Sequence, residues 1–442
     1  MDKNTVIGLV LIGLVIFGFS WLNRPDPQEI EAQRKAAIEA ARQDSIAKAE
    51  AELLAARTQE ATPDSIKQAA GYNQYGLLAA ATAGAEEQVE LANGKIALKL
   101  STKGGAIREV LLRDYKTHDG KPLYLFREGE SDFNLPLRTV DNRLVDTRDL
   151  YFSPISRTDS SVVMRLAVDS ASYLDLAYVL LPDDYRLRMT VSGQNLQSLF
   201  PANMTMQDLE WSQRIRRQEK SWKFENQYTS IYYKYSGDEV DRLSDSKQED
   251  KKTLEEPLHW VSFKDKYFAS VLVCDSYFEN NKLAQKTAAA GSDYLKNCTM
   301  SATFPLDVRP GTKAGFTFFF GPLKYNMLRA YDKGMKAEDN LDLDHLVYLG
   351  ASIFRWINRY MIIPASTYFS NWGLIILLLT LGIKLLISPL AYKGYLSSAK
   401  MRLLRPQVQE INAKYPGKDQ ESMMKRQSAT MNLYRAAGAG PM

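Results

Sequence analysis

The sequence predicts a membrane protein in which a large antiparallel β domain lies between an N-terminal anchor and a C-terminal group of helices. Two apolar runs, Thr5–Leu22 and Trp372–Leu390, are long enough to cross a bilayer. Between them, residues 88–325 alternate apolar and polar positions, with frequent turn signals and little helical periodicity. The 442 residues are 45% apolar and 24% charged, which is ordinary for a folded chain.

The first run, residues 5–22, is interpreted as an uncleaved transmembrane anchor. A signal peptide has a basic start, a shorter apolar core and a cleavage site of small residues. Here Lys3 is offset by Asp2, and the residues at the end of the run, Ser20-Trp-Leu-Asn-Arg24, contain no Ala-x-Ala pattern. Residues 23–87 are rich in Ala, Glu, Gln, Lys and Arg and contain few large apolar side chains. We therefore expect a charged linker there, either a solvated helix or a disordered tether, rather than a partner-binding coiled coil.

Residues 88–325 predict a sandwich of two antiparallel sheets. Turn signals such as Asn93-Gly94, Gly104-Gly105 and Asp119-Gly120 separate runs of alternating apolar residues, for example Val162–Val168 and Phe316–Phe320. The two cysteines, Cys274 and Cys298, lie in or beside predicted strands. The sequence leaves open whether they form a disulfide or two buried thiols.

Residues 346–361 predict an amphipathic helix in the membrane interface. Apolar residues recur three or four positions apart, and Arg355 and Arg359 lie one turn apart outside that stripe, beside Trp356. Trp372, which opens the second apolar run, is a further expected interface residue. The alternative is an ordinary helix packed on the β domain.

Residues 372–391 predict a transmembrane helix that carries one buried charge, Lys384. A lysine near the centre of such a helix costs about 2.5–3.5 kcal/mol on insertion scales. The 12 Leu and Ile residues of the run outweigh that cost. Charges of this kind face a bundle interior or a wet cavity, so Lys384 is the leading candidate for a functional residue.

Residues 392–436 predict a helical hairpin with a turn at Tyr415-Pro416-Gly417. From Lys393 to Arg435 nine basic and three acidic residues give a net charge of +6. The positive-inside rule places this hairpin in the cytoplasm, so the β domain is expected in the periplasm. An interaction with RNA is a weaker interpretation of the same charges, because basic residues beside a membrane helix more often set topology or contact anionic lipid.

Sequence motifs of enzymes are missing. The chain contains no Gly-x-Ser-x-Gly, Walker loop, His-Glu-x-x-His or dinucleotide fingerprint. Its three histidines, His118, His259 and His345, have no metal-ligand spacing. We expect no catalytic residue, no metal and no cofactor. The absence of a motif does not exclude an enzyme, but it favours the expectation that the chain is not one.

Several segments together resemble the YidC-type membrane protein insertases. The run from Asn371 to Lys393 is similar to the first core helix of that family, and Ser398–Pro406, Ile411–Tyr415 and Leu433–Arg435 are similar to its cytoplasmic hairpin. Further similarity lies in Gly104-Gly105, Trp260–Ala269, Phe320-Gly-Pro322 and Phe354–Arg359.

This resemblance implies a mutarotase-like β sandwich and an insertase or chaperone activity in the bacterial inner membrane, alone or with the Sec translocon. It also implies a hydrophilic groove with one positive charge, at the position of Lys384. The expected partners are nascent membrane proteins, the Sec translocon, the ribosome transiently and membrane lipids, but no specific nucleic acid. The hairpin residues Lys400, Arg402 and Arg405 are expected contacts. Because the family has further transmembrane helices beyond the hairpin, we expect a multi-pass protein that is truncated here, with residues 437–442 starting the missing part.

Two other functions are compatible with these residues. One is a membrane-anchored periplasmic binding module, for which a sugar site would need exposed aromatic residues such as Trp211, Trp222 or Trp260 beside paired carboxylates. The other is a structural scaffold for the Sec machinery. Lys384 favours the insertase, because a simple anchor needs no buried charge.

Overall fold

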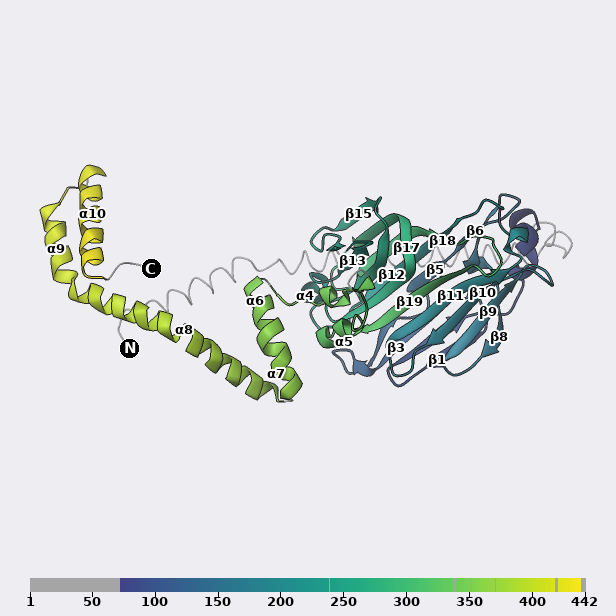
Figure 1. Cartoon of the computed structure of the whole chain (residues 1–442), viewed down its shortest axis with the longest axis horizontal. Helices are drawn as coiled ribbons and strands as arrows, with labels where there is room; N and C mark the ends of the chain where they lie inside the picture. The colour runs from purple at the N-terminus through teal and green to yellow at the C-terminus, as the bar shows by residue number, and fades with distance from the viewer. Residues whose placement is uncertain are drawn as a thin grey trace, which may run out of the picture. The chain divides into compact units, whose positions relative to one another are not determined.

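The computed structural model describes residues 72–237, 239–336, 339–350, 352–369, 371–417 and 420–438. The predicted anchor at 5–22, the first part of the predicted linker and residues 439–442 lie outside the described residues. The chain divides into two compact units, Met1–Val347 and Tyr348–Met442, which are called here the β unit and the helical unit. Figure 1 shows the strands in the first and the long helices in the second.

The larger sheet of the β unit is antiparallel and has the strand order β14-β13-β16-β17-β19-β11-β10-β9-β8. Its strands alternate apolar and polar residues, and this places one face of each strand in the core. The bounds are β8 Ser153–Arg157, β9 Ser161–Ala167, β10 Tyr173–Leu180, β11 Arg186–Gln194, β13 Ser230–Tyr235, β14 Val240–Arg242, β16 Leu258–Lys264, β17 Phe268–Thr287 and β19 Lys313–Pro322.

The opposite layer combines the strands β5-β12-β18-β17-β15 with a separate sheet of order β1-β2-β3-β4, and β6 and β7 pair beside them. The bounds are β1 Gln88–Ala92, β2 Ile96–Ser101, β3 Ile107–Lys116, β4 Pro122–Phe126, β5 Ser131–Asn134, β6 Pro136–Arg138, β7 Leu144–Asp146, β12 Met206–Arg216, β15 Glu249–Leu254 and β18 Tyr294–Pro305. Short helices are η1 Gly76–Thr82, η2 Thr147–Asp149, η3 Leu196–Ser198, α4 Trp222–Asn226, α5 Tyr325–Ala330 and η5 Leu343–Leu346.

Strand β17 belongs to both layers. Its first part, Phe268–Cys274, pairs with β19, whereas Lys282–Thr287 pairs with β18. The register shifts between these parts, and Asn280 takes a positive φ of 51° there. Such a local irregularity lets one strand bend from one sheet into the next.

Aromatic side chains from both layers fill the core of the sandwich. Trp211 of β12 stacks on Phe263 of β16 with ring centroids 3.9 Å apart. Phe133 of β5 meets Phe318 of β19 edge to face at 5.6 Å. These contacts cross between the layers, so the predicted two-layer antiparallel sandwich is confirmed.

Gly105 is required by a close approach between the layers. Its φ is 62°, and a Cβ at this position would lie 2.7 Å from Leu176 Cδ1. The buried hydroxyl of Tyr178 donates a hydrogen bond of 2.7 Å to the Gly105 carbonyl. The glycine pair that the sequence marks as a turn thus also joins the small sheet to β10.

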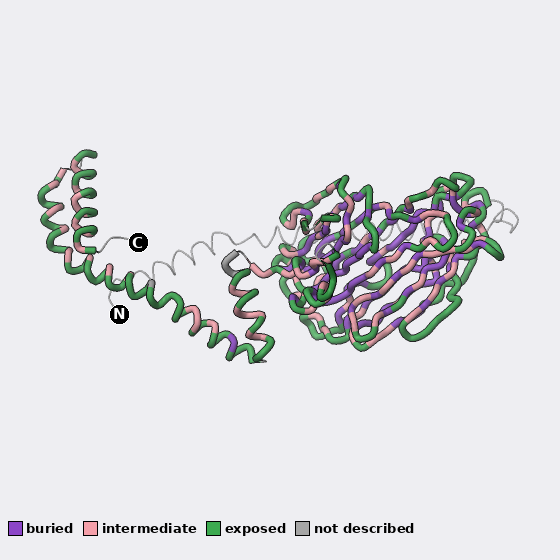
Figure 2. Tube along the Cα trace, viewed as in Figure 1, coloured by how far each residue is buried: buried purple, intermediate pink, exposed green. Residues whose placement is uncertain are grey.

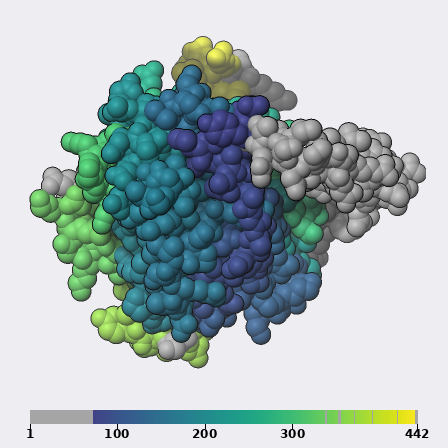
Figure 3. Space-filling model, turned by 90° about the vertical axis from the view of Figure 1, so that its right-hand side faces the viewer, coloured from purple at the N-terminus to yellow at the C-terminus, as the bar shows by residue number. Residues whose placement is uncertain are grey.

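The core of the β unit extends beyond residues 88–325 at both ends. Residues 72–87 were expected in a solvated linker, but η1 is packed, with Leu78 fully buried in the core. In Figure 3 the purple residues at the start of the described chain lie on the surface of the β unit. Leu346, expected to open the interfacial helix, is 1% exposed in η5 and belongs to the β core. Burying the apolar side chains of these short segments against the sheet is more favourable in free energy than leaving them in solvent.

The helical unit contains α6 Ser352–Ile357, a π-helical turn η6 Asn358–Ile362, α7 Ile363–Tyr368, α8 Trp372–Leu403, α9 Arg405–Lys414 and α10 Gln420–Ala436. The helix predicted at 346–361 therefore begins later, at Ser352, and continues to Tyr368. The predicted transmembrane helix does not end at residue 391, because α8 passes through Pro389 to Leu403. The first residues of the predicted hairpin thus belong to α8, while α9 and α10 form its two arms.

Candidate functional site in the membrane helix

Helix α8 is long, apolar and mostly exposed. Asn371 caps its start, since its side-chain oxygen accepts hydrogen bonds from the backbone N–H groups of Gly373 at 2.9 Å and Leu374 at 3.3 Å. Residues Trp372–Pro389 have a mean hydropathy of 2.0, and only 6% of that stretch is buried. Figure 2 shows the contrast with the buried strands. Among the described residues this is the one helix long and apolar enough to cross a membrane.

One face of α8 packs on the preceding helices of the same unit. Ile375 is 3% exposed, and a Cβ on Gly382 would lie 3.8 Å from Met361 Cε in η6. Lys384 follows Ile375 by nine residues, so the two side chains point about 180° apart around the helix axis. Lys384 is exposed and therefore occupies the face that α6 to α7 leave open.

Lys384 is the one ionisable residue within Trp372–Pro389. At 1.5 Å per residue it lies about 18 Å along the axis from Trp372 and about 7.5 Å from Pro389. If Trp372–Pro389 crosses a hydrocarbon core about 30 Å thick, the Cα of Lys384 lies inside the apolar layer, on the side nearer the hairpin.

The expected interface residues Arg355, Trp356 and Arg359 are exposed in α6 and η6, and Trp372 is exposed at the start of α8. The Trp356 and Tyr360 rings lie 5.7 Å apart, and the Arg359 guanidinium lies 5.9 Å from the Tyr360 ring centroid. Aromatic rings beside cations are typical of the headgroup layer of a membrane. The π-helical turn at Asn358–Ile362 was not expected from the sequence.

The hairpin residues have different environments. The Lys400 ammonium donates to the carbonyls of Ala437 at 3.4 Å and Gly438 at 3.3 Å, which tie the end of α10 back to α8. This contact satisfies carbonyls at a helix C-terminus, where a cation is favourable. Arg402 and Arg405 are exposed. Because Lys400 follows Lys384 by 16 residues, about 24 Å of helix separates the two charges, and the predicted site residues do not form one cluster.

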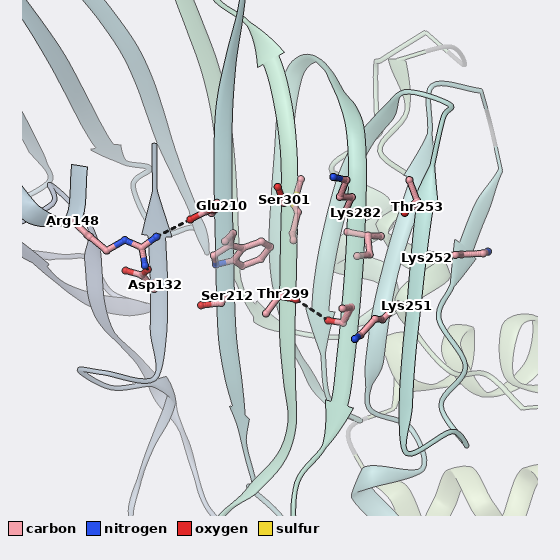
Figure 4. A pocket seen from close by; sticks show the side chains of 14 residues that line it. Asp132, Arg148, Glu210, Ser212, Lys251, Lys252, Thr253, Lys282, Thr299 and Ser301 are labelled. Atoms are coloured by element: carbon pink, nitrogen blue, oxygen red, sulfur yellow. Dashed lines mark hydrogen bonds and ion pairs between the residues drawn. The ribbon is translucent and has the colours of Figure 1, made fainter. Parts of the chain in front are cut away.

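The β unit carries an open cleft of about 500 Å³ on the outer face of β12, β18, β17 and β15. Figure 4 shows charged side chains on both sides and small hydroxyl side chains between them. On one side the Arg148 guanidinium contacts Asp132 at 3.1 Å and Glu210 at 2.7 Å. Lys251 and Lys282 lie on the other side.

The cleft lacks the aromatic platform that a sugar-binding module would need. Trp211 is 2% exposed and turns inward onto Phe263. Trp260 is fully buried, and the indole N–H of the partly buried Trp222 donates to the Tyr294 carbonyl at 2.8 Å. All three tryptophans therefore support the fold, and this weakens the interpretation of the chain as a carbohydrate-binding module.

Buried charges in the β unit are functional or structural features that sequence reasoning missed. The Lys234 ammonium is 2.6 Å from Asp342 Oδ2 and 2.5 Å from the Asn340 carbonyl. Asp332, Asp342 and Asp344 lie close enough to hold a cation. Lys234 already pairs with Asp342, and Asp332 accepts backbone N–H groups of Leu341 and Asp342. The cluster thus stabilises a loop. Its only sequence signal is a lysine inside a strand.

A β sandwich outside the membrane, joined to an exposed apolar helix with one charge, defines an integral membrane protein with a large extramembranous domain. Family models agree with this class: residues 88–363 match the YidC periplasmic domain and residues 364–442 match the 60Kd inner membrane protein family. The chain belongs to the YidC family of membrane protein insertases.

Curated relatives carry the same description along the whole chain. A membrane protein insertase YidC of Porphyromonas gingivalis is 99% identical over all of this chain, which spans 71% of that relative. The corresponding protein of Parabacteroides distasonis is 44% identical, again over all of this chain and 71% of the relative. The protein is thus an inner-membrane insertase that acts on newly made membrane proteins, rather than an enzyme.

Solved structures give weaker matches. A putative aldose 1-epimerase from Escherichia coli K12 covers 54% of this chain and 100% of its own, with 11% identity and a TM-score of 0.34. A YidC insertase crystal structure covers 81% of this chain and 67% of its own, with 15% identity and a TM-score of 0.27. The family assignment rests on the sequence matches.

Proposed function

We propose that Lys384 supplies the positive charge of a hydrophilic groove through which this insertase moves polar segments of its clients across the membrane. The observation that carries this proposal is the position of Lys384, inside the apolar stretch of α8 and on the face that α6 to α7 leave open.

An ammonium inside the apolar layer recruits water and acceptor groups, because an unsolvated charge there is costly. A client segment with carboxylates or backbone carbonyls then crosses a shorter apolar barrier than it would in pure lipid. Lysine acts as a point charge on a flexible stem and lacks the two-pronged geometry of arginine. We therefore expect general attraction for acidic and polar segments, rather than a fixed clamp on one carboxylate.

We further propose a multi-pass topology with an anchor at 5–22, a linker that ends near residue 71, and the β unit in the periplasm. The span at 372–391 then leads to a cytoplasmic hairpin. The net charge of +6 from Lys393 to Arg435 supports this orientation. Protease added outside spheroplasts is expected to cut residues 72–347 and to spare the hairpin. Cleavage of the hairpin from outside would show that the proposed topology is inverted.

We propose that the hairpin and the β unit provide the contacts with the ribosome and the Sec translocon. We propose that exposed Arg402 and Arg405 contact the ribosome transiently as a client emerges. The chain would act alone on some clients and with the Sec translocon on others. Cross-linking from Arg402→Cys during synthesis of a client tests the ribosome contact, with exposed Lys313→Cys on the β unit as the matched control.

The proposal for Lys384 is tested by client insertion. This chain replaces the aligned part of the full-length Porphyromonas gingivalis relative, and the hybrid is expressed in an insertase-depleted strain. Lys384→Arg is expected to retain insertion, because the charge is kept. Lys384→Ile removes a membrane cost of about 3 kcal/mol, yet it is expected to slow the delivery of clients with charged translocated tails.

A relocated charge provides the matched control. Leu377 lies seven residues before Lys384, on nearly the same face of α8 and about 10.5 Å along the axis. Lys384→Ile combined with Leu377→Lys keeps one lysine in the helix but moves it away from the hairpin side. We expect it to insert clients no better than Lys384→Ile. If Lys384→Ile inserts every client as well as the wild type at matched expression, the groove role is wrong, and Lys384 simply extends to the headgroups.

A further inference from the structure

One end of the β unit carries a compact surface of aromatic rings and lysines, which we call the aromatic–lysine face. It consists of Lys223, Phe224, Lys266, Tyr267 and Lys324. The Lys266 ammonium lies 3.4 Å from the Phe224 ring centroid and 5.1 Å from that of Tyr267. The Tyr267 carbonyl accepts a hydrogen bond of 2.7 Å from the backbone N–H of Leu323, next to Lys324. Helix α4, the β16–β17 turn and the start of α5 therefore form one continuous surface.

The aromatic–lysine face is held in shape by buried groups beneath it. Asp265 accepts hydrogen bonds of 2.6 Å from the N–H groups of Tyr267 and Phe268, which fixes the β16–β17 turn. Glu225 accepts from the N–H groups of Gln218 and Glu219, which fixes the entry to α4. Both acids are buried. Their carboxyl groups are thus kept below the surface, while the lysines remain on it.

The exposed rings are not needed by the core of the β unit. Phe224 is 46% exposed and Tyr267 is 44% exposed, although the sandwich buries most of its other aromatic residues. Lys223, which precedes Phe224 in the chain, and Lys324, which follows Leu323, are both exposed. Amphipathic rings interleaved with lysines are the composition found at the level of lipid headgroups, where the rings enter the interface and the ammonium groups meet phosphates.

The chain itself tethers the β unit to the membrane that α8 is expected to cross. The β unit ends at Val347, and the apolar stretch of α8 begins at Trp372. The 24 residues between them, 348–371, would span about 80 Å if fully extended. Helices α6 to α7 shorten that reach, since a helix rises only about 1.5 Å per residue. Figure 1 shows α4 and α5 at the same end of the sandwich.

We propose that the aromatic–lysine face docks on the anionic phospholipid surface of the membrane that α8 crosses. Phe224 and Tyr267 enter the headgroup layer, and Lys223, Lys266 and Lys324 contact lipid phosphates. The inference goes beyond the insertase function, since it concerns how the large domain is held at the membrane. Each lysine near an anionic surface contributes a factor of about fivefold to the ratio of docked to undocked domain.

The test uses the full chain in vesicles of neutral lipid or of neutral and anionic lipid mixed, with nitroxide-labelled headgroups as quencher. Flotation with the vesicles is measured first and tests the span through α8 separately. A fluorophore is attached to Gln227→Cys, an exposed position at the end of α4, or to Ser170→Cys in the exposed β9–β10 turn. The native cysteines do not interfere, because both are 1% exposed.

We expect several-fold stronger quenching at Gln227→Cys than at Ser170→Cys in anionic vesicles, and weaker quenching at Gln227→Cys in neutral ones. Lys223→Glu is expected to reduce it by fivefold or more. Lys313→Glu, the same charge change at the exposed start of β19, is expected to leave it unchanged. Equal quenching at the two positions, or quenching that ignores both anionic lipid and Lys223→Glu, overturns the proposal. Either result would assign the face to solvent or to a protein partner.

Discussion

The buried ion pair between Lys234 and Asp342 is expected to determine whether the last segment of the β unit stays attached to the sheet. The Lys234 side chain is 2% exposed and that of Asp342 is 24% exposed. Removing one partner of a buried pair costs about 3–5 kcal/mol, because the other charge remains buried. In Asp342→Asn the Asn340 carbonyl remains as a neutral acceptor at 2.5 Å. We therefore expect Asp342→Asn to lower the free energy of unfolding by about 3 kcal/mol, the lower end of this range.

Urea unfolding followed by tryptophan fluorescence measures this loss. The indole N–H of Trp260 donates to the Leu341 carbonyl at 2.6 Å, so Trp260 reports on the same segment. Asp342→Asn is expected to lower the urea midpoint with little change in slope. Lys234→Met combined with Asp342→Asn is expected to regain most of the loss, since no uncompensated charge remains.

An exposed pair serves as the control for that experiment. Lys251 and Glu249 lie 2.7 Å apart, but both are largely exposed, so Glu249→Gln is expected to change the midpoint little. A loss below about 1 kcal/mol for Asp342→Asn, or a double variant no more stable than the single one, would refute the reasoning about buried charge.

Two further predictions concern the β unit. Burial, with the nearby charge of Asp265, raises the pKa of Glu225 from 4.5 to about 8, so the folded state binds this proton more tightly than the unfolded state. The contribution of Glu225 to stability is complete below pH 4.5 and is lost as the pH rises to about 8. Glu225→Gln should therefore show a smaller fall in Tm over this pH range than the wild type. An equal fall in Tm would contradict the pKa shift. Cys274 and Cys298 are free and buried, and burial raises the pKa of both thiols, that of Cys298 to about 12. A maleimide should label neither thiol in the folded protein and both after unfolding without reductant, whereas no labelling after unfolding would indicate a disulfide.

Much of the architecture could be predicted because it depends on local patterns. A period of two along the chain predicts the strands, and β9 and β19 lie where the alternation of apolar residues places them. The membrane span and the charge of Lys384 within it follow from composition and length. The hairpin at 392–436 also follows from its turn signal at Tyr415-Pro416-Gly417, between α9 and α10. The family resemblance rested on the same segments.

Boundaries were predicted less well, because hydrophobicity and helix formation end at different places. The apolar run stops near Leu390, but Ala391, Lys393, Leu396 and Ala399–Leu403 are good helix formers, so α8 continues to Leu403. Pro389 removes one backbone donor without ending the helix. Leu346 likewise matches a helical stripe in sequence, but its position beside the sheet makes it part of the β core.

The sequence by itself determined the fold class, the span, the position of its charge and the family. The tertiary structure alone decided which strands share a sheet, where β17 changes layers, and which charges meet. Lys234 and Asp342 are 108 residues apart. Lys266 in the β16–β17 turn contacts the ring of Phe224 in helix α4. Periodicity reports which face of a segment is apolar, but it does not name the segment that will cover that face. That choice is made by packing over the whole molecule, where burial and hydrogen bonding of distant residues are satisfied together.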